Sequence, residues 1–374
     1  MKAGWEVKPL GEVCAVQNGG TPKSNIADYW GNEVPWLTPK DMGQQGTAYV
    51  GDTPRKITQL GLSKCSAKLV PIGSVIMSTR APIGHLSINT VPMAFNQGCR
   101  GLTPSENVDL KFLFYFLLGN VEPLQELGTG ATFKELSAGA LKGFQMPIPP
   151  LAEQKQIVAV LDAAFEGLTR AKENAEANLQ NARELFESLA KQHFMEIDGE
   201  FVSLGECCEI YQPKTISKKE MREDGEFIVF GANGPIGRYH TYNHKEPQLL
   251  VTCRGATCGF INTSEPFSWI TGNAMVVMPK QAGLERKYLE AIFKGFVDFS
   301  QVITGAAQPQ ITRASLSPLK IPVPDLQTQH TIINALSAAR LCIDDLEAQY
   351  TTKLTDIADL RQSLLQKAFA GDLT

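Results

Sequence analysis

The residues best suited to chemistry in this sequence are cations and amides in polar, glycine-rich turns. An arginine fork binds guanine, and an asparagine or glutamine amide binds adenine, each through two hydrogen bonds at the base edge in the major groove. Lysines beside such turns bind phosphates. For any one residue, an exposed polar side chain or a turn former is the simpler interpretation, but the set as a whole favours DNA binding. The predicted DNA-binding residues are Lys40, Gln44, Gln45, Arg80, Asn96, Gln97, Lys214, Asn233, Arg238, Arg254, Asn273 and Gln308.

No motif of a known catalytic site occurs in the sequence. There is no G-x-x-x-x-G-K-S/T phosphate loop, no H-E-x-x-H zinc helix and no G-x-S-x-G nucleophile elbow. The N/D-P-P-Y/F tetrapeptide of an amino-methyltransferase is missing as well. The spacing of His240, His244, Cys253 and Cys258 fits no zinc pattern. We therefore predict a chain without catalytic residues, without a metal and without a cofactor of its own.

Length and charge are those of an ordinary globular protein with two or three domains. The 374 residues carry a net charge of −4 and are 43% hydrophobic. The charge is unevenly spread, with net +2 over residues 1–150, −5 over 151–200, +2 over 201–324 and −3 over 325–374. The two mildly basic segments permit DNA binding without requiring it.

Cysteine usage and hydrophobicity indicate a cytoplasmic protein. The eight cysteines form no paired C-x-x-C set, which is typical of reduced thiols. The longest apolar run, from Phe112 to Leu118, is far too short to cross a membrane. Residues 1–10 have no apolar core of a secretory signal. We therefore predict a cytoplasmic location and no membrane contact.

An internal repeat organises the chain. The stretch from Pro147 to Ile157 opens a helical run to about Phe194, and it returns at a shift of 175 residues in a run that ends near Phe369. The match continues without a gap for more than forty residues, which defines a repeat. Matching pairs at this shift include Leu151 with Leu326, Gln154 with Gln329, Leu161 with Leu336 and Phe194 with Phe369.

The segments before the two helical runs also resemble each other. Residues 249–255 resemble the region of residues 76–80, and residues 304–308 resemble residues 128–132. Near the start of each copy the shift is 194 rather than 175, so the second copy lacks 19 residues in its front half. We place the missing stretch broadly in the region from Trp30 to Trp36. One fold with different front loops is the pattern expected of two domains that read different targets.

The repeat predicts two long helices that pair. Apolar residues recur alternately three and four positions apart over five heptads, which is typical of a coiled coil. About 42 residues at ~1.5 Å each would form a rod of about 60 Å. The alternative is that each helix packs on its own preceding domain. The predicted seam and partner-binding residues are Ile157, Leu161, Leu168, Leu185, Leu189, Leu336, Ile343, Leu346, Tyr350, Ile357, Leu360 and Leu364.

Several short motifs are distributed along the whole chain. They are Gly19-Gly20-Thr21-Pro22, Tyr29-Trp30-Gly31, Val34-Pro35-Trp36, Ser78-Thr79-Arg80-Ala81-Pro82-Ile83-Gly84, Phe95-Asn96-Gln97-Gly98, Pro147-Ile148-Pro149-Pro150-Leu151 with Glu153-Gln154, and the ending from Leu364 to Leu373. Together these motifs resemble those of the specificity subunit of a type I restriction-modification system. The resemblance covers essentially the whole chain, although the second copy lacks the Tyr-Trp-Gly and Pro-Trp pieces.

The resemblance implies an α+β fold with a pseudo-two-fold internal repeat. Two similar mixed α/β target-recognition domains would be joined by two long antiparallel helices that form a coiled coil. The recognition domains would be residues 1–150 and 201–324, and the spacer helices residues 151–200 and 325–374.

The same resemblance implies a division of labour. Each recognition domain would read one half of a bipartite site on double-stranded DNA, and the helix pair would set the gap and dock two methyltransferase subunits. S-adenosylmethionine, ATP and Mg²⁺ would bind to those and to motor-nuclease subunits. The main alternative is a coiled-coil interaction scaffold without direct DNA readout, and a second is a nuclease or methyltransferase that acts by itself.

Overall fold

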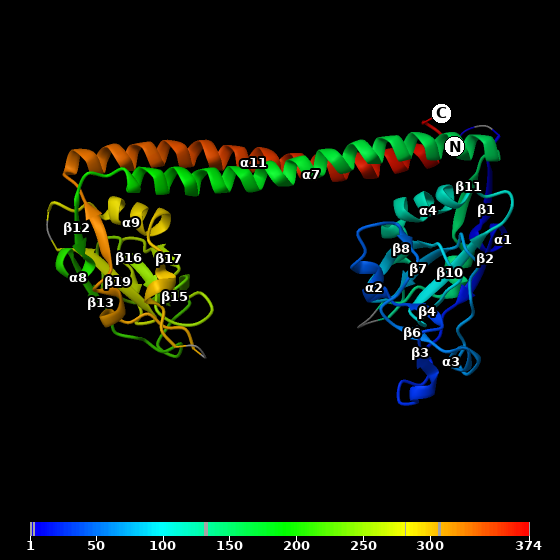
Figure 1. The fold of residues 1–374 in the computed structure, drawn as a ribbon, viewed down its shortest axis with the longest axis horizontal. Coiled ribbons are helices and arrows are strands. Elements are labelled where there is room, and N and C mark those ends of the chain that lie inside the picture. The colour runs from blue at the N-terminus through cyan, green and yellow to red at the C-terminus, as the bar shows by residue number, and fades with distance from the viewer. Residues whose placement is uncertain (1, 3, 131–133, 281, 306–307, 374) are drawn as a thin grey trace. The chain divides into compact units, whose positions relative to one another are not determined.

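The computed structural model describes residues 2, 4–130, 134–280, 282–305 and 308–373 (Figure 1). The chain divides into two compact units. Unit 1 is Met1–Asn174 with Lys353–Thr374, and unit 2 is Ala175–Thr352. Two 45-residue helices, α7 (Leu151–Met195) and α11 (Leu326–Ala370), each contribute to both units. Each unit therefore holds a mixed α/β body and a portion of each long helix.

Unit 1 contains a two-stranded sheet β1-β11, a five-stranded sheet β2-β10-β7-β8-β5 and a four-stranded sheet β3-β6-β4-β9. Its strands are β1 (Glu6–Pro9), β2 (Cys14–Asn18), β3 (Trp30–Gly31), β4 (Val34–Leu37), β5 (Tyr49–Val50), β6 (Lys56–Ile57), β7 (Val75–Thr79), β8 (Ile83–Asn89), β9 (Ala94–Phe95), β10 (Cys99–Pro104) and β11 (Gln145–Ile148). Its shorter helices are α1 (Leu10–Val13), α2 (Pro39–Gly43), α3 (Gln59–Ser63), α4 (Leu110–Gly119), α5 (Val121–Glu126), α6 (Ala138–Gly143) and the 3-10 turn η1 (Ala27–Tyr29).

Unit 2 contains a two-stranded sheet β12-β20, a four-stranded sheet β13-β19-β16-β17 and a three-stranded sheet β15-β14-β18. Its strands are β12 (Glu200–Ser203), β13 (Cys208–Tyr211), β14 (Phe227–Gly231), β15 (Gly234–Tyr239), β16 (Leu249–Thr252), β17 (Ile261–Thr263), β18 (Trp269–Ile270), β19 (Ala274–Pro279) and β20 (Lys320–Val323). Its shorter helices are α8 (Leu204–Cys207), α9 (Arg286–Gly295), α10 (Arg313–Leu316) and the 3-10 turn η2 (Phe299–Val302).

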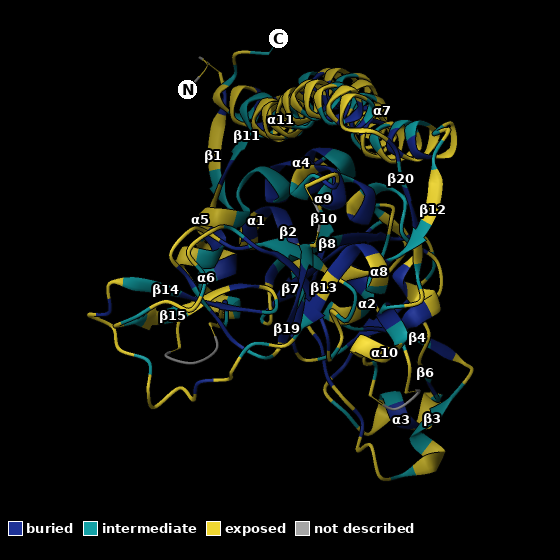
Figure 2. Ribbon diagram, turned by 90° about the vertical axis from the view of Figure 1, so that its left-hand side faces the viewer, coloured by how far each residue is buried: buried dark blue, intermediate teal, exposed yellow. Residues whose placement is uncertain are grey.

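The core of each unit lies between its central sheet and the long helices. In unit 1 helix α4 is buried from Phe112 to Leu117, as expected for a helix that is apolar on every side. Its side chains share one core with Val75 of the sheet and with Leu161 and Leu365 of the long helices. In unit 2 helix α9 has the equivalent place, because Leu289 packs in a core with Leu336. Figure 2 shows the buried residues of α4 and α9 beneath the long helices.

The two bodies are built on one plan, which confirms the predicted internal repeat. The pair β1-β11 corresponds to β12-β20, and the order β2-β10-β7-β8 corresponds to β13-β19-β16-β17. The parallel pair β4-β9 corresponds to the parallel pair β14-β18. The predicted mixed α/β fold with two similar copies is therefore correct.

The place predicted for the missing residues is wrong. Strand β4, which contains Trp36, corresponds to β14. Strand β4 pairs in parallel with β9, and β14 pairs in parallel with β18, the equivalent short strand of unit 2. The difference lies in the next connection, where residues 38–74 (37 residues) of unit 1 correspond to residues 231–248 (18 residues) of unit 2. In unit 1 this stretch forms α2, β5, β6 and α3, whereas in unit 2 it forms the hairpin strand β15 and a loop. The absence of the aromatic motifs from the second copy wrongly suggested a missing segment. The strand itself is retained in unit 2, with Val229 at the position of Trp36.

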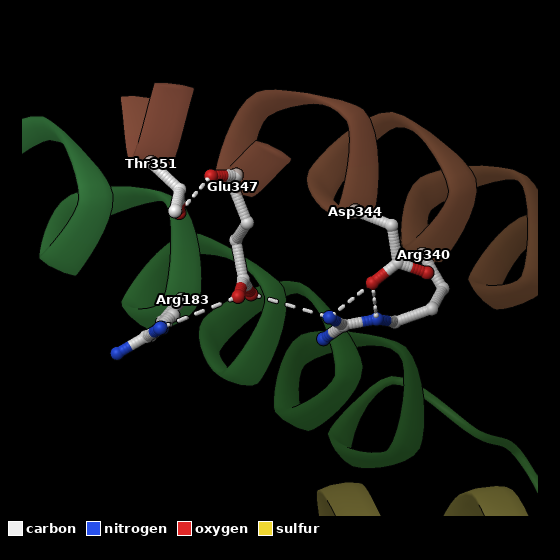
Figure 3. A network of polar contacts seen from close by, with 5 residues as sticks. All are labelled: Arg183, Arg340, Asp344, Glu347 and Thr351. Carbon is white, nitrogen blue, oxygen red and sulfur yellow. Dashed lines mark hydrogen bonds and ion pairs between the residues drawn. The ribbon is translucent and has the colours of Figure 1, made fainter. Parts of the chain in front are cut away.

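The long helices run antiparallel, as predicted. In unit 2 the guanidinium of Arg183 on α7 lies 3.4 Å from Glu347 on α11, while Phe186, further along α7, lies under Arg340, which comes earlier on α11. Figure 3 shows how Glu347 is shared between Arg183 and Arg340. In unit 1 Arg361 of α11 stacks on Phe165 of α7, at 4.7 Å from the ring centroid. At the shift of 175, Phe165 corresponds to Arg340 and Arg361 corresponds to Phe186. The same arginine–phenylalanine contact therefore occurs in both units, but the arginine and the phenylalanine stand at exchanged positions of the repeat.

Most predicted seam residues are buried or half-buried, but three are not. Leu185, Leu346 and Leu360 are 59%, 36% and 49% exposed, so their assignment to the buried seam is wrong. A strict 3.5-residue period drifts by about 20° per heptad against a straight helix. Near its end, α7 instead buries Ala182, Ala190 and Phe194 and half-buries Phe186, at intervals of four. The residues that remain on the buried or half-buried side are Ile157, Leu161, Leu168, Leu189, Leu336, Ile343, Tyr350, Ile357 and Leu364.

The drift arises because the long helices pack on the bodies as well as on each other. Phe194 of α7 contacts Tyr288 of α9, with ring centroids 5.9 Å apart. A methyl group at Gly295 of α9 would lie only 2.6 Å from the Cβ of Ala190. Each helix is therefore shared between its coiled-coil partner and a globular body. Within the described residues, no helix has the length and apolar composition of a membrane span.

Candidate nucleic-acid interface

In unit 1 the predicted residues Arg80, Asn96 and Gln97 lie together at one edge of the central sheet. Arg80 directly follows β7, and Asn96 and Gln97 form the turn between β9 and β10. A methyl group at Gly98 would lie 3.0 Å from Arg80 Nε and 3.2 Å from Asn96 Oδ1, so both side chains border this glycine. The structure therefore brings three residues from two separate turns to one place.

Two further charged residues complete this group. Arg100 donates from Nη1 to the main-chain carbonyl of Gln97 at 3.0 Å. The carboxylate of Glu135 lies 3.9 Å from Arg80 and 3.8 Å from Arg100. We call these five residues, Arg80, Asn96, Gln97, Arg100 and Glu135, the Arg80 cluster.

Burial shifts the pKa of two groups at this cluster, Arg100 and the neighbouring Cys99. It lowers the pKa of the Arg100 guanidinium, and the nearby Glu135 carboxylate opposes that shift. Burial raises the pKa of the Cys99 thiol to about 12, so this thiol remains protonated and unsuited to nucleophilic chemistry. The arrangement is that of a binding surface, with cations and amides presented on turns.

The predicted residues Lys40, Gln44 and Gln45 lie on helix α2 and directly after it. Lys40 and Gln44 are exposed, whereas Gln45 accepts a hydrogen bond from Ser87 Oγ at 2.9 Å. Met42 of the same helix places its Sδ 3.9 Å from Cys99 Sγ, at the first residue of β10. Helix α2 therefore packs next to the Arg80 cluster.

In unit 2 the predicted residues Asn233, Arg254, Asn273 and Gln308 surround the turn after β16. Asn233 donates from Nδ2 to Thr257 Oγ1 at 2.9 Å and accepts from Thr252 Oγ1 at 3.0 Å. The main-chain carbonyl of Asn273 accepts from the amide of Cys253, next to Arg254, at 3.4 Å. Arg254 also forms a main-chain bridge with Gln310, two residues after Gln308. These residues, Asn233, Arg254, Asn273, Gln308 and Gln310, are the Arg254 cluster.

Lys214 and Arg238 have different surroundings. Gln212 donates from Nε2 to the carbonyl of Gly272 at 3.3 Å, which places the loop of Lys214 beside Asn273. Arg238 donates to the carbonyls of Gly225 and Glu226 at 2.6 and 2.8 Å. Its guanidinium therefore braces a loop of unit 2, and the structure does not bring it into the Arg254 cluster.

His244 and Cys253 of unit 2 make contacts within the fold. Both ring nitrogens of His244 have hydrogen-bond partners, Tyr211 and Asn243, each at 2.7 Å. Cys253 is buried, and its Sγ lies 3.5 Å from the Val251 carbonyl. Among the described residues, no group of three or more histidine, cysteine or acidic side chains is placed to hold a metal.

Comparison with known proteins identifies the family. The model of the type I restriction modification DNA specificity domain matches residues 2–179 and again residues 196–356. The chain belongs to this family. It is 33% identical over 256 residues to the MjaIX specificity subunit of a type I restriction enzyme from Methanocaldococcus jannaschii, covering 66% of this chain and 57% of that subunit. The match thus spans little more than half of that relative's length.

Other specificity subunits cover more of the chain. Identity is 28% over 344 residues to the EcoprrI specificity subunit of Escherichia coli, covering 86% of this chain and 84% of that subunit. A chain from a solved type I R-M system has a TM-score of 0.82 at 21% identity, over 100% of this chain and 99% of that one. The HsdS subunit from Thermoanaerobacter tengcongensis has a TM-score of 0.61 at 20% identity, over 100% and 98%. These two structures show a shared fold.

Three members of the two specificity-domain clusters are absent from the predicted set: Arg100, Glu135 and Gln310. Glu135 and Gln310 each contact a predicted arginine from a segment distant in sequence, whereas Arg100 lies only three residues after its partner Gln97. The available signal was the repeat itself, because Glu135 and Gln310 fall on each other at the shift of 175, beside two loops that were recognised as similar.

Proposed function

We propose that this chain is the DNA-recognition subunit of a type I restriction-modification complex, in which each unit reads one half of a bipartite site. One observation carries the proposal: each unit presents an arginine after the equivalent strand, Arg80 after β7 and Arg254 after β16, among amides from neighbouring turns. Two similar domains with different side chains on one frame suit two different half-sites. Arginine and amide side chains supply the hydrogen bonds that distinguish base edges.

In this proposal residues 1–150 and 201–324 are the recognition domains, and residues 151–200 and 325–374 form the spacer. The spacer sets the gap between the half-sites and docks two methyltransferase subunits. Adenine methylation with S-adenosylmethionine, and cleavage with ATP and Mg²⁺, belong to partner subunits including motor nucleases. The chain itself contributes recognition and no reaction.

Exposed leucines on the long helices suit the docking of a partner. In unit 2 Leu185 and Leu341 are 59% and 72% exposed, and they adjoin Phe186 and Arg340, which contact each other across the helix pair. Apolar side chains of this size at neighbouring sites favour a protein contact. We expect the double variant Leu185→Glu, Leu341→Glu to lose co-purification with the methyltransferase subunits while its thermal midpoint stays unchanged. Undiminished co-purification would place the docking surface elsewhere.

The proposed function is tested by mapping methylated adenines in the host genome with and without this gene. Loss of one bipartite methylation motif on deletion, restored by the gene, is the expected result. A methylation pattern that does not depend on the gene contradicts DNA recognition by this chain. If the chain joins methyltransferase subunits but the assembly does not bind DNA, it is an interaction scaffold. If the purified chain modifies DNA without partners, it is an enzyme.

A further inference from the structure

The Arg80 and Arg254 clusters lie on equivalent backbone arrangements, with matching main-chain hydrogen bonds in the two units. In unit 1 the amides and carbonyls of Thr129 and Glu135 exchange hydrogen bonds of 3.1 and 2.9 Å, and Leu136 donates to the carbonyl of Thr79 at 2.9 Å. In unit 2 Thr304 and Gln310 exchange hydrogen bonds of 2.8 and 2.9 Å, and Ile311 donates to the carbonyl of Cys253 at 2.9 Å. Any difference in chemistry between the two clusters therefore comes from their side chains.

The main difference is a carboxylate. Glu135 in unit 1 stands where unit 2 has the neutral amide of Gln310, at the same bridge to the arginine-bearing turn. Arg100, the second cation near Glu135, corresponds at the shift of 175 to the buried Met275. Within the described residues, Arg254 has no carboxylate at ion-pair distance. Among the residues that the structure describes, one arginine of the repeat thus has a carboxylate at ion-pair distance and the other does not.

The geometry of Glu135 leaves Arg80 attracted but not fixed. Separations of 3.9 Å to Arg80 and 3.8 Å to Arg100 are ion-pair distances longer than a hydrogen bond. Arg100 is held in place, because its Nη1 also donates to the carbonyls of Gln97 and Cys99 at 3.0 and 2.9 Å. The side chain of Arg80 is 35% exposed, so it remains available to a ligand.

A carboxylate in this position affects contacts with DNA phosphates and contacts with base edges differently. A phosphate is an anion, which Glu135 repels and with which it competes for Arg80. A base edge offers neutral acceptors, so the repulsion is weaker and the two-pronged contact is retained. Phosphate contacts carry affinity without sequence information. A repulsive group that weakens the wrong contact more than the right one raises specificity.

We propose that Glu135 is a positioning residue for DNA reading in unit 1: it withholds Arg80 from phosphates and thereby increases discrimination between bases. Unit 2 lacks this restraint, because Gln310 is neutral, and Arg254 there contributes more to affinity and less to discrimination. This inference rests on the proposed function.

The experiment uses the full-length chain assembled with its methyltransferase subunits, together with the reciprocal variants Glu135→Gln and Gln310→Glu. Each side chain already occurs on the equivalent backbone of the other unit, so the fold tolerates both. Binding is measured against the wild-type site and against sites with one altered base pair in either half-site, over a series of salt concentrations. Arg80→Ala identifies the half-site that unit 1 reads.

For Glu135→Gln we expect discrimination in the unit 1 half-site to fall by about tenfold, and the slope of log affinity against log salt to steepen by about 1. Gln310→Glu should raise discrimination in the other half-site and make the slope shallower. A purely structural role of Glu135 would not change the salt slope. The inference is overturned if Glu135→Gln leaves both quantities unchanged, or alters both half-sites equally. If the wild-type assembly recognises no bipartite site, the proposed function fails, and this inference fails with it.

Discussion

A guanidinium distinguishes base edges only if the backbone holds it in a defined place, because an unrestrained side chain loses its entropy on binding. The turn that carries Arg80 is held on both sides. Thr79 donates to the carbonyl of Gly98 at 2.7 Å, and its own carbonyl accepts from Leu136 at 2.9 Å. The turn is therefore fixed to two other segments of unit 1, and Arg80 projects from a rigid base.

From this geometry, Arg80→Ala should remove a base contact in one half-site only. We expect a loss of about 1–3 kcal/mol of discrimination there, the value typical of a two-pronged arginine contact. The matched variant is Arg254→Ala, which should affect the other half-site. The readout is the methylated motif together with binding to single-base variants of each half-site. An unaltered motif in Arg80→Ala would make this arginine a turn residue only.

At the scale of single residues, sequence pattern predicted Arg80 and Arg254 as DNA-binding residues, because the turns that carry them are local signals. It did not identify Glu135, whose side chain matters only through contacts with Arg80 and Arg100, 55 and 35 positions earlier in the chain. Arg238 was also predicted from its residue type alone, and the structure shows that its guanidinium donates to main-chain carbonyls of unit 2. Local propensity does not reveal which polar side chains the fold itself will use.

At the scale of elements, one buried glutamine per unit fixes each long helix to its body. Gln154 donates from Nε2 to the carbonyls of Asn107 and Pro149, both at 2.9 Å, and accepts from the amide of Asp109 at 2.8 Å. Asp109 is the N-cap of α4, so this side chain joins the starts of α4 and α7. Gln329 makes the same three contacts in unit 2, with Gly283, Pro324 and Glu285, the N-cap of α9.

Replacing Gln154 by leucine should therefore destabilise unit 1. The variant leaves two carbonyls and one amide buried without partners, which we expect to cost about 2–4 kcal/mol of unfolding free energy. Gln329→Leu should have the same effect on unit 2. The control is Gln156→Leu, an exposed position where the change should stay within about 0.5 kcal/mol. Urea denaturation gives the magnitude, and hydrogen exchange of the α4 amides should localise the loss. Equal stability of the Gln154 and Gln156 variants would contradict this role.

For the long helices, periodicity in the sequence predicts the helix limits better than the buried side. The helical runs predicted to end near Phe194 and Phe369 agree with the ends of α7 and α11 within one residue, because caps, prolines and repeat spacing are local signals. The spacer helices predicted over residues 151–200 and 325–374 are longer than the observed helices, which cover residues 151–195 and 326–370. Their buried side was predicted less well, since a heptad frame assumes a single partner. Ala190 and Phe194 follow the body of unit 2 instead, which no periodicity within the helix encodes.

At the scale of the whole molecule, the two copies of the repeat share a backbone frame and differ in the side chains that it presents. Each unit has its own core, so a change of recognition side chains in one unit leaves the other core intact. The acidic charge is concentrated in residues 151–200 and 325–374, while the two bodies are mildly basic. Acidic spacer segments would disfavour phosphate contacts outside the recognition domains, which agrees with reading confined to the bodies.

This organisation predicts the effect of lengthening the spacer. Inserting seven residues into both α7 and α11 adds about 10.5 Å of helix and nearly preserves the buried face, because seven residues are close to two turns. We expect the unread gap of the bipartite motif to grow by up to about three base pairs, while both half-site sequences remain the same. Methylation mapping of the variant measures both quantities. A two-residue insertion into each helix is the control, since it rotates the following side chains by about 200° and should abolish assembly rather than alter the gap. Half-sites that change in the seven-residue variant would show that the helix pair does not act as a spacer.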